Sequence, residues 1–246
     1  MAAVQFSFDE FISELQSIED IASSYLQSDA AAIFYKLRST LQNLRQHSPI
    51  GQQPWIVELD SPLKTKMSPG SYMPSSEGQH TVWAEISWLW EISCDREGGG
   101  RRTKSFRVTG NASTKVTILQ NRENERDELA MWRFEIGHDT APGCHFHVQI
   151  LGEKTVPPFP HSLDVPRLPT ILVTPMAVIE YVLAELFQDE WPVHIAGNGR
   201  SLQNWQSIQK RRLGKLFDWC HNAVRRSSGS PWTTLKMEKP PIELFT

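Results

Sequence analysis

The sequence predicts an α+β fold with an N-terminal helical hairpin, an antiparallel meander sheet of four to five strands, and C-terminal helices packed on one sheet face. Three observations predict it. Apolar residues recur at helical spacing before residue 50, alternate with period two between residues 81 and 151, and return to helical spacing after residue 174. Of the 246 residues, 39% are hydrophobic and 22% are charged, so the chain can bury a core. We expect three parts: a helical hairpin over residues 1–50, an α+β domain over residues 51–226, and a loosely attached tail over residues 227–246.

The predicted hairpin consists of two helices, over residues 7–27 and 29–44. Ser7 and Asp29 have side chains that favour the capping position at the start of a helix. The apolar stripes of the two helices contain Phe8, Phe11, Ile12, Leu15, Ile18, Ala22, Tyr25 and Leu26, and then Ile33, Phe34, Leu37, Leu41 and Leu44. A helix pair cannot bury both stripes by itself. The hairpin therefore either packs on the sheet or mediates oligomerisation or partner binding.

Four longer strands are predicted over residues 81–93, 105–119, 129–138 and 144–151, with a short fifth strand over residues 55–59. Successive side chains on a strand point to opposite faces. The apolar, inward set contains Val82, Ala84, Ile86, Trp88, Trp90, Ile92, Phe106, Val108, Ala112, Val116, Ile118, Ala130, Trp132, Phe134, Ile136, Cys144, Phe146, Val148 and Ile150. The other face is expected to be polar, and either open or under a loop. Gly110 is expected at a bulge or bend.

Two helices are predicted after a Pro-rich connection. Thr174 and Pro175 have the residue types preferred at the cap and the first position of a helix. The last helix, over residues 201–226, has a basic side with Lys210, Arg211, Arg212, Lys215, Arg225 and Arg226. This side is either solvated or attracts an anionic partner. Of the nine Trp residues, those outside the predicted buried stripes are candidates for a ligand or partner surface: Trp55, Trp83, Trp191, Trp219 and Trp232.

The densest cluster of reactive side chains lies in residues 138–147. His145 and His147 are two positions apart on a predicted strand, so both imidazoles are expected on one face. The short turn before them places Glu135 opposite His147. Two imidazoles and one carboxylate favour a divalent metal site, for Mn, Mg or Zn. Metal-free acid–base or phosphate-binding chemistry, and plain hydrogen-bonded strand residues, are the alternatives. His138, in the same cluster, is a candidate catalytic residue.

Three cations are candidate phosphate contacts. Lys115 and Arg133 share the predicted outer face by alternation, and the turn places Arg133 opposite Gln149. Arg167 lies in the Pro-rich connection. There it is either held out toward an anion or paired with a carboxylate.

The triplet His145-Phe146-His147 resembles the His-hydrophobic-His motif of HUH endonucleases, which cut single-stranded DNA or join its ends. The resemblance implies that the two His bind a divalent metal and that a helix-borne Tyr attacks the phosphate. Tyr181 is the only Tyr on a downstream predicted helix. The chain departs from the replication-initiator branch because Ala and Glu stand at positions 184 and 185, where that branch often has a Lys. The family's first motif is not evident.

A second resemblance is to uncharacterised bacterial proteins of defence or toxin–antitoxin neighbourhoods. They show a strand, a His/Pro-rich turn, an HxH strand, an Arg-Pro-like connection, and a helix near Thr-Pro. The matching residues here are those of the strand at 132–137, His138, Pro142, His145, His147, the segment 166–169, Thr174, Pro175 and Phe187. This resemblance fits the order of elements over about 60 residues, and it implies no established activity.

Composition excludes several classes of protein. No apolar run approaches the roughly 20 residues of a membrane helix, and the first residues lack the basic start of a signal peptide. Three Cys fit reduced thiols in the cytoplasm. A net charge of −3 argues against a protein that coats nucleic acid indiscriminately. We therefore expect a cytoplasmic protein without a membrane partner.

Two functions are predicted. The first is metal-assisted processing of a phosphodiester or nucleic acid, in which His145, His147 and Glu135 hold the ion while the cations hold phosphate. The second is a non-catalytic module of a bacterial defence or toxin–antitoxin system. It binds a ligand, a protein partner or a second copy of the chain.

Overall fold

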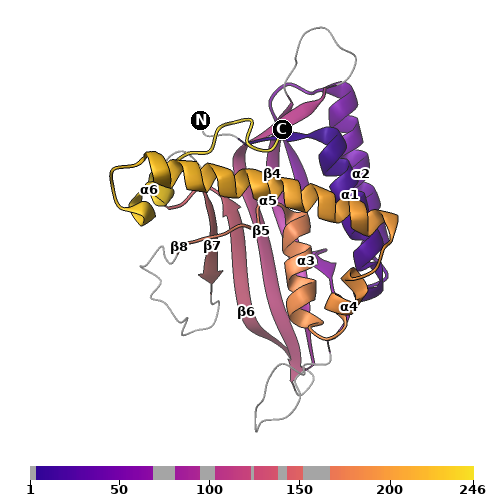
Figure 1. Cartoon of the computed structure of the whole chain (residues 1–246). Coiled ribbons are helices and arrows are strands. Elements are labelled where there is room, and N and C mark those ends of the chain that lie inside the picture. Colours follow the sequence, from indigo (N-terminus) through magenta and orange to yellow (C-terminus); the bar gives the residue numbers. More distant parts are fainter. Residues whose placement is uncertain (1–3, 69–80, 95–102, 123–124, 138–142, 152–166) are drawn as a thin grey trace.

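The computed structural model confirms the α+β fold (Figure 1). It describes residues 4–68, 81–94, 103–122, 125–137, 143–151 and 167–246. Within these residues, no helix is both long enough and apolar enough to cross a membrane.

Eight strands form one sheet in the described part of the chain, where four to five were predicted. Its order is β2 (Gln52–Val57), β4 (Val82–Cys94), β5 (Ser105–Arg122), β6 (Glu125–Ile136), β7 (Phe146–Leu151) and β8 (Arg167–Pro169), with β1 (Val4–Ser7) beside β5 and β3 (Leu63–Lys64) beside β4. All pairs are antiparallel, and β4 to β7 form the predicted meander. The predicted number of strands was too low because three strands are very short: β1, β3 and β8 have four, two and three residues. So few residues do not show an alternating pattern.

The bulge expected at Gly110 is present. Trp90 pairs with Ala112 while Ile92 pairs with Val108, so residues 109–111 of β5 face a single residue of β4. A bulge of this kind bends the strand and increases its twist.

The predicted helical hairpin consists of α1 (Phe8–Ala22) and α2 (Ala30–His47), followed later by α3 (Pro175–Leu186), α4 (Trp191–Ile195) and α5 (Arg200–Arg226). Ser7 caps α1, because its hydroxyl accepts a hydrogen bond from the Glu10 amide. Buried side chains of α1, α2, α3 and α5 join one face of the sheet in a single hydrophobic cluster that contains Phe11, Trp90 and Leu183. Figure 1 shows α5 lying across the strands, with α3 running alongside them.

The C-terminal tail is attached more firmly than predicted. Phe245 is 2% exposed, its ring stacks on Phe6 with centroids 5.4 Å apart, and it bridges to Phe6 through the backbone. The Gln5 amide also donates to the Ile242 carbonyl. The helix α6 (Pro231–Met237) lies between this anchor and α5, and none of its residues is fully buried. This anchor was not predicted because two apolar residues at the very end, Leu244 and Phe245, are too few to indicate a core element.

Most of the Trp residues proposed for a ligand or partner surface belong to the interior. Trp55, Trp83 and Trp191 are buried, Trp219 is half-buried, and Trp232 is 77% exposed. Trp83 is informative because it lies on the sheet face opposite the helices, as do the buried Leu119 and Met131. The end of the outer face that contains Trp83, Leu119 and Met131 is therefore apolar and buried. The polar surface expected from alternation occupies only the remaining part of the outer face.

Candidate anion-binding face of the sheet

Four polar side chains from four neighbouring strands form one row across the outer face, which we define as the sheet face opposite α1, α3 and α5. Lys115 of β5 pairs with Arg133 of β6, Arg133 pairs with Gln149 of β7, and Gln149 pairs with Arg167 of β8. Directly opposed residues have Cβ atoms about 5 Å apart. We call Lys115, Arg133 and Arg167 the cation row. All three are half-buried, so their stems pack on the sheet while their charged ends can meet a ligand.

The rows on either side of the cation row each contain a carboxylate. Glu135 lies 3.9 Å from Arg133, and Glu85 lies 3.8 Å from Lys64. Among the described residues of these three rows, the cations are Lys64 and the cation row, and the carboxylates are Glu85 and Glu135. A line of cations on one sheet face favours an anionic ligand.

Arg167 is positioned by a close backbone approach. A Cβ atom on Gly143 would stand 2.7 Å from Cδ and 3.2 Å from Cβ of Arg167. Only glycine leaves room for the arginine stem at this point. The side chain of Arg167 is therefore packed against the segment that leads into β7.

His147 and Glu135 form a hydrogen-bonded pair next to the cation row. Their opposed positions confirm the predicted register. His147 Nε2 lies 3.0 Å from Glu135 Oε2, and Nδ1 lies 2.9 Å from the Cys144 carbonyl oxygen. Gln149 Nε2 donates to the same Glu135 oxygen at 3.0 Å. His147 is 1% exposed, and both of its ring nitrogens face oxygen acceptors. Both ring nitrogens of His147 are therefore within hydrogen-bonding distance of oxygen atoms of the protein itself.

His145 lies apart from this pair, contrary to the expectation that both imidazoles share a face. It occupies a bend before β7, which begins at Phe146, so strand alternation does not extend to it. Its ring is buried and lines a pocket with Phe146 and Trp219. Within the described residues, no group of three His, Cys, Asp or Glu side chains is placed to hold a metal ion. A site for Mn, Mg or Zn stays a prediction.

Tyr181, the candidate nucleophile, lies on the other side of the sheet from His147. It belongs to α3, is 38% exposed, and its ring contacts Phe134, a member of the apolar inner face, at a centroid distance of 6.4 Å. Burial raises the pKa of the Tyr181 hydroxyl, and the nearby Glu185 carboxylate raises it further. A phenol with a raised pKa is a weaker nucleophile at neutral pH. His138, the other candidate catalytic residue, lies outside the described residues.

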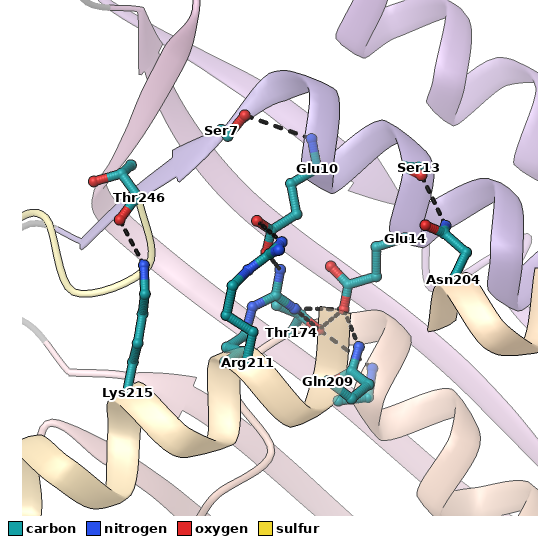
Figure 2. Close-up of polar contacts among 12 residues, drawn as sticks. Ser7, Glu10, Ser13, Glu14, Thr174, Asn204, Gln209, Arg211, Lys215 and Thr246 are labelled. Carbon is teal, nitrogen blue, oxygen red and sulfur yellow. Dashed lines mark hydrogen bonds and ion pairs between the residues drawn. The ribbon is translucent and has the colours of Figure 1, made fainter. Parts of the chain in front are cut away.

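The sequence analysis missed a second polar cluster, which holds α5 against α1 (Figure 2). Glu14 is fully buried, and its Oε1 atom accepts hydrogen bonds from Arg212 at 2.5 Å, from Gln209 at 2.8 Å and from the Thr174 hydroxyl at 2.8 Å. Arg212 also contacts Glu10 at 3.3 Å. The guanidinium group of Arg212 lies over the Phe6 and Phe245 rings, at 5.6 and 5.9 Å from their centroids.

Arg212 was predicted on the solvated, basic side of its helix, and this was wrong. The missed signal was its spacing, because it lies four residues after Ile208 and four before Leu216, on the buried stripe. Glu14 likewise falls between Phe11 and Ile18 on the buried stripe of α1. Charged residues at stripe positions on two helices indicate a buried ion pair.

Comparison of the chain with family models, curated proteins and solved structures finds no match. The chemistry of the outer face therefore carries the functional argument. On that face the guanidinium groups of Arg133 and Arg167 and the ammonium group of Lys115 lie in one row with the side-chain amide of Gln149. These groups are suited to binding phosphate oxygens.

Proposed function

We propose that the protein is a non-catalytic binding module that holds a nucleic-acid strand on the outer face of its sheet. The cation row carries this proposal, because Lys115, Arg133 and Arg167 come from three different strands and reach one line across the sheet. Phosphate contacts of this kind position a nucleic acid without reading its sequence.

The length of the row favours a polymer over a single phosphate group. From β5 to β8 the row crosses three strand spacings, or about 14 Å. A single inorganic phosphate cannot contact both ends of such a line, whereas an extended backbone presents one phosphate after another. The two arginines can bind phosphate oxygens in bidentate geometry, and Lys115 adds a point charge.

Binding without catalysis is favoured over the phosphodiester-processing hypothesis. Tyr181 and His147 lie on opposite faces of the sheet, and His147 is buried with both nitrogens hydrogen-bonded. A general acid or base needs a proton-transfer atom within reach of the substrate. His147 instead orients Glu135, which in turn lies beside Arg133.

We further place this binding module in the cytoplasm, with a role in bacterial defence. The three free cysteines support a reducing compartment. The defence role rests on the similarity of residues 132–187 to proteins of defence neighbourhoods.

Fluorescence anisotropy with a labelled single strand of about 16 nucleotides tests the proposal, since this length covers the site sizes typical of single-strand binding. We expect Arg133→Ala to weaken binding about tenfold, as loss of one charge-assisted contact does. Lys36→Ala, which removes an equally charged but distant and exposed side chain on α2, should leave affinity unchanged.

Competition separates the ligand classes. If unlabelled single strand displaces the labelled single strand, while ATP or inorganic phosphate at equal phosphate concentration displaces it poorly, the result supports a nucleic-acid site. Equal displacement by ATP would assign the face to a nucleotide. No binding of strand or ATP at low salt would overturn the proposal.

A further inference from the structure

A pocket lies between α5, α6 and the last two strands of the sheet, away from the cation row. Its volume is about 130 Å³. Apolar side chains line most of it: Phe146, Ile171, Leu216, Phe217, Trp219 and Leu235. Cys144, His145 and Cys220 also border it. Figure 1 shows that α5 continues past β7 and β8 toward α6, so the pocket lies where the helices overhang the sheet.

Large apolar side chains remain exposed around this pocket. Phe217 is 53% exposed and Ile171 is 49% exposed, and both line it. On the neighbouring elements, Leu168 of β8 is 44% exposed, and Trp232 and Met237 of α6 are 77% and 71% exposed. α6 has no fully buried residue. Large exposed apolar side chains gathered on neighbouring elements around a pocket are typical of an interaction site.

The two helices beside the pocket carry more basic than acidic residues. Residues 200–239 contain nine Lys and Arg but only two acidic residues, in a chain with a net charge of −3. Two of these cations, Arg211 and Arg212, are neutralised by Glu10 and Glu14 of α1. Arg225, Arg226 and Lys236 are exposed on α5 and α6, and Arg226 has an ion pair with Glu238 at 3.5 Å.

One exposed cation lies next to the pocket, because Lys236 directly follows Leu235, which lines it. Burial raises the pKa of the Cys144 thiol, while a backbone hydrogen bond and the Lys236 ammonium group oppose that rise. An apolar pocket beneath positive charge complements a ligand that is apolar on one side and acidic on the other.

We propose that the surface formed by α5, α6 and β8 docks an acidic, amphipathic segment of a partner protein, whose large apolar anchor side chain fills the pocket. A pocket of this volume takes one buried anchor of the kind that dominates interface energetics. An amphipathic helix places such an anchor and its flanking acids on adjacent faces, so the anchor enters the pocket while carboxylates meet Lys236 and other exposed cations of α5 and α6. This docking surface lies on the helix side of the sheet, whereas the cation row lies on the outer face.

The probe for the test is a fluorescein-labelled helical peptide of about 15 residues, near the minimum length for a stable helix. It carries Leu and Phe at positions i and i+4 and Glu along the flanking face. Two matched peptides replace either the apolar pair by Ala or every Glu by Lys. We expect the first peptide to bind about tenfold more tightly than either control peptide, and its affinity to fall as salt rises.

Variants of the protein test where the peptide binds. Phe217→Glu should abolish binding and Lys236→Glu should weaken it, whereas Tyr35→Glu, at an equally exposed aromatic residue of α2, should have no effect. Circular dichroism melts of each variant confirm that it is folded. Equal binding of the Glu and Lys peptides, or unchanged binding by Phe217→Glu, would overturn the proposal. Concentration-dependent dimerisation that Phe217→Glu removes would also overturn it, by assigning the surface to a second copy of the chain.

Discussion

Two charged clusters of this protein differ in how deeply their charges are buried. Between α1 and α5, the Arg212 side chain is 5% exposed and meets the carboxylates of Glu14 and Glu10. On the outer sheet face, the members of the cation row are half-buried, and the Arg133 side chain is 40% exposed. The first cluster is closed to ligands, while the second can meet one.

The difference teaches which cluster serves the fold and which serves binding. A buried charge must find its counter-charge within the protein, because an uncompensated one is very costly. A half-exposed charge has no such requirement and contributes little to stability. The α1–α5 cluster is therefore assigned to architecture and the cation row to ligand binding, and four predictions test this assignment from the largest expected effect to the smallest.

Removal of one partner from the buried cluster should have the largest effect. Arg212→Ala leaves the Glu14 carboxylate buried without its counter-charge, and we expect a loss of about 3–5 kcal/mol in the free energy of unfolding. Urea denaturation measures it. The double variant Glu14→Leu with Arg212→Met removes both charges and should recover most of that loss. A single variant as stable as wild type would show that the pair does not hold α5 in place.

Loss of the buried imidazole should have the next largest effect. His147→Ala removes two hydrogen bonds, one to the Cys144 carbonyl and one to Glu135, and leaves a cavity in a buried position, at a cost of about 2–3 kcal/mol. His47→Ala, at an exposed His of α2, is the control and should change stability by less than about 0.5 kcal/mol. If His147→Ala were as stable as wild type but lost bound Mn or Zn, the metal-site hypothesis would be favoured over the structural role.

Arg133→Ala should separate stability from binding. The side chain of Arg133 is 40% exposed and its ion pair with Glu135 spans 3.9 Å, so its removal should change the free energy of unfolding by less than about 1 kcal/mol. The same variant should lose about tenfold in affinity for a single strand. A loss of stability comparable to that of Arg212→Ala would place the cation row with the architecture instead.

Tyr181→Phe should have the smallest effect. The hydroxyl is partly exposed and lies on the helix side of the sheet, so stability should change by less than about 0.5 kcal/mol. We expect no covalent adduct with a single-stranded DNA, in the presence or absence of Mn, for wild type or variant. A denaturing gel shows this directly. An adduct that forms with wild type and disappears with Tyr181→Phe would restore the endonuclease hypothesis.

Much of the fold followed from periodicity, and the gaps have physical causes. Alternation predicted the faces of β4 to β7, and turn length predicted that Glu135 opposes His147 and that Arg133 opposes Gln149. Arg167 could not be placed beside Gln149, because β8 is three residues long and lies in a Pro-rich segment. His145 was misplaced since alternation holds only inside a strand, and β7 begins one residue later. The pairing of Glu14 with Arg212 joins residues 198 positions apart; their spacing places each on a buried stripe, but no local pattern identifies the partner.

The salt dependence of single-strand binding tests the central claim most directly. Each phosphate that a cation neutralises contributes about −0.7 to the slope of log K against log salt concentration for a single strand, so three contacts predict a slope of about −2. The triple variant Lys115→Ala, Arg133→Ala, Arg167→Ala should lose nearly all of this slope while it stays folded. A triple variant with the affinity and slope of wild type would contradict the assignment of the outer face to nucleic-acid binding.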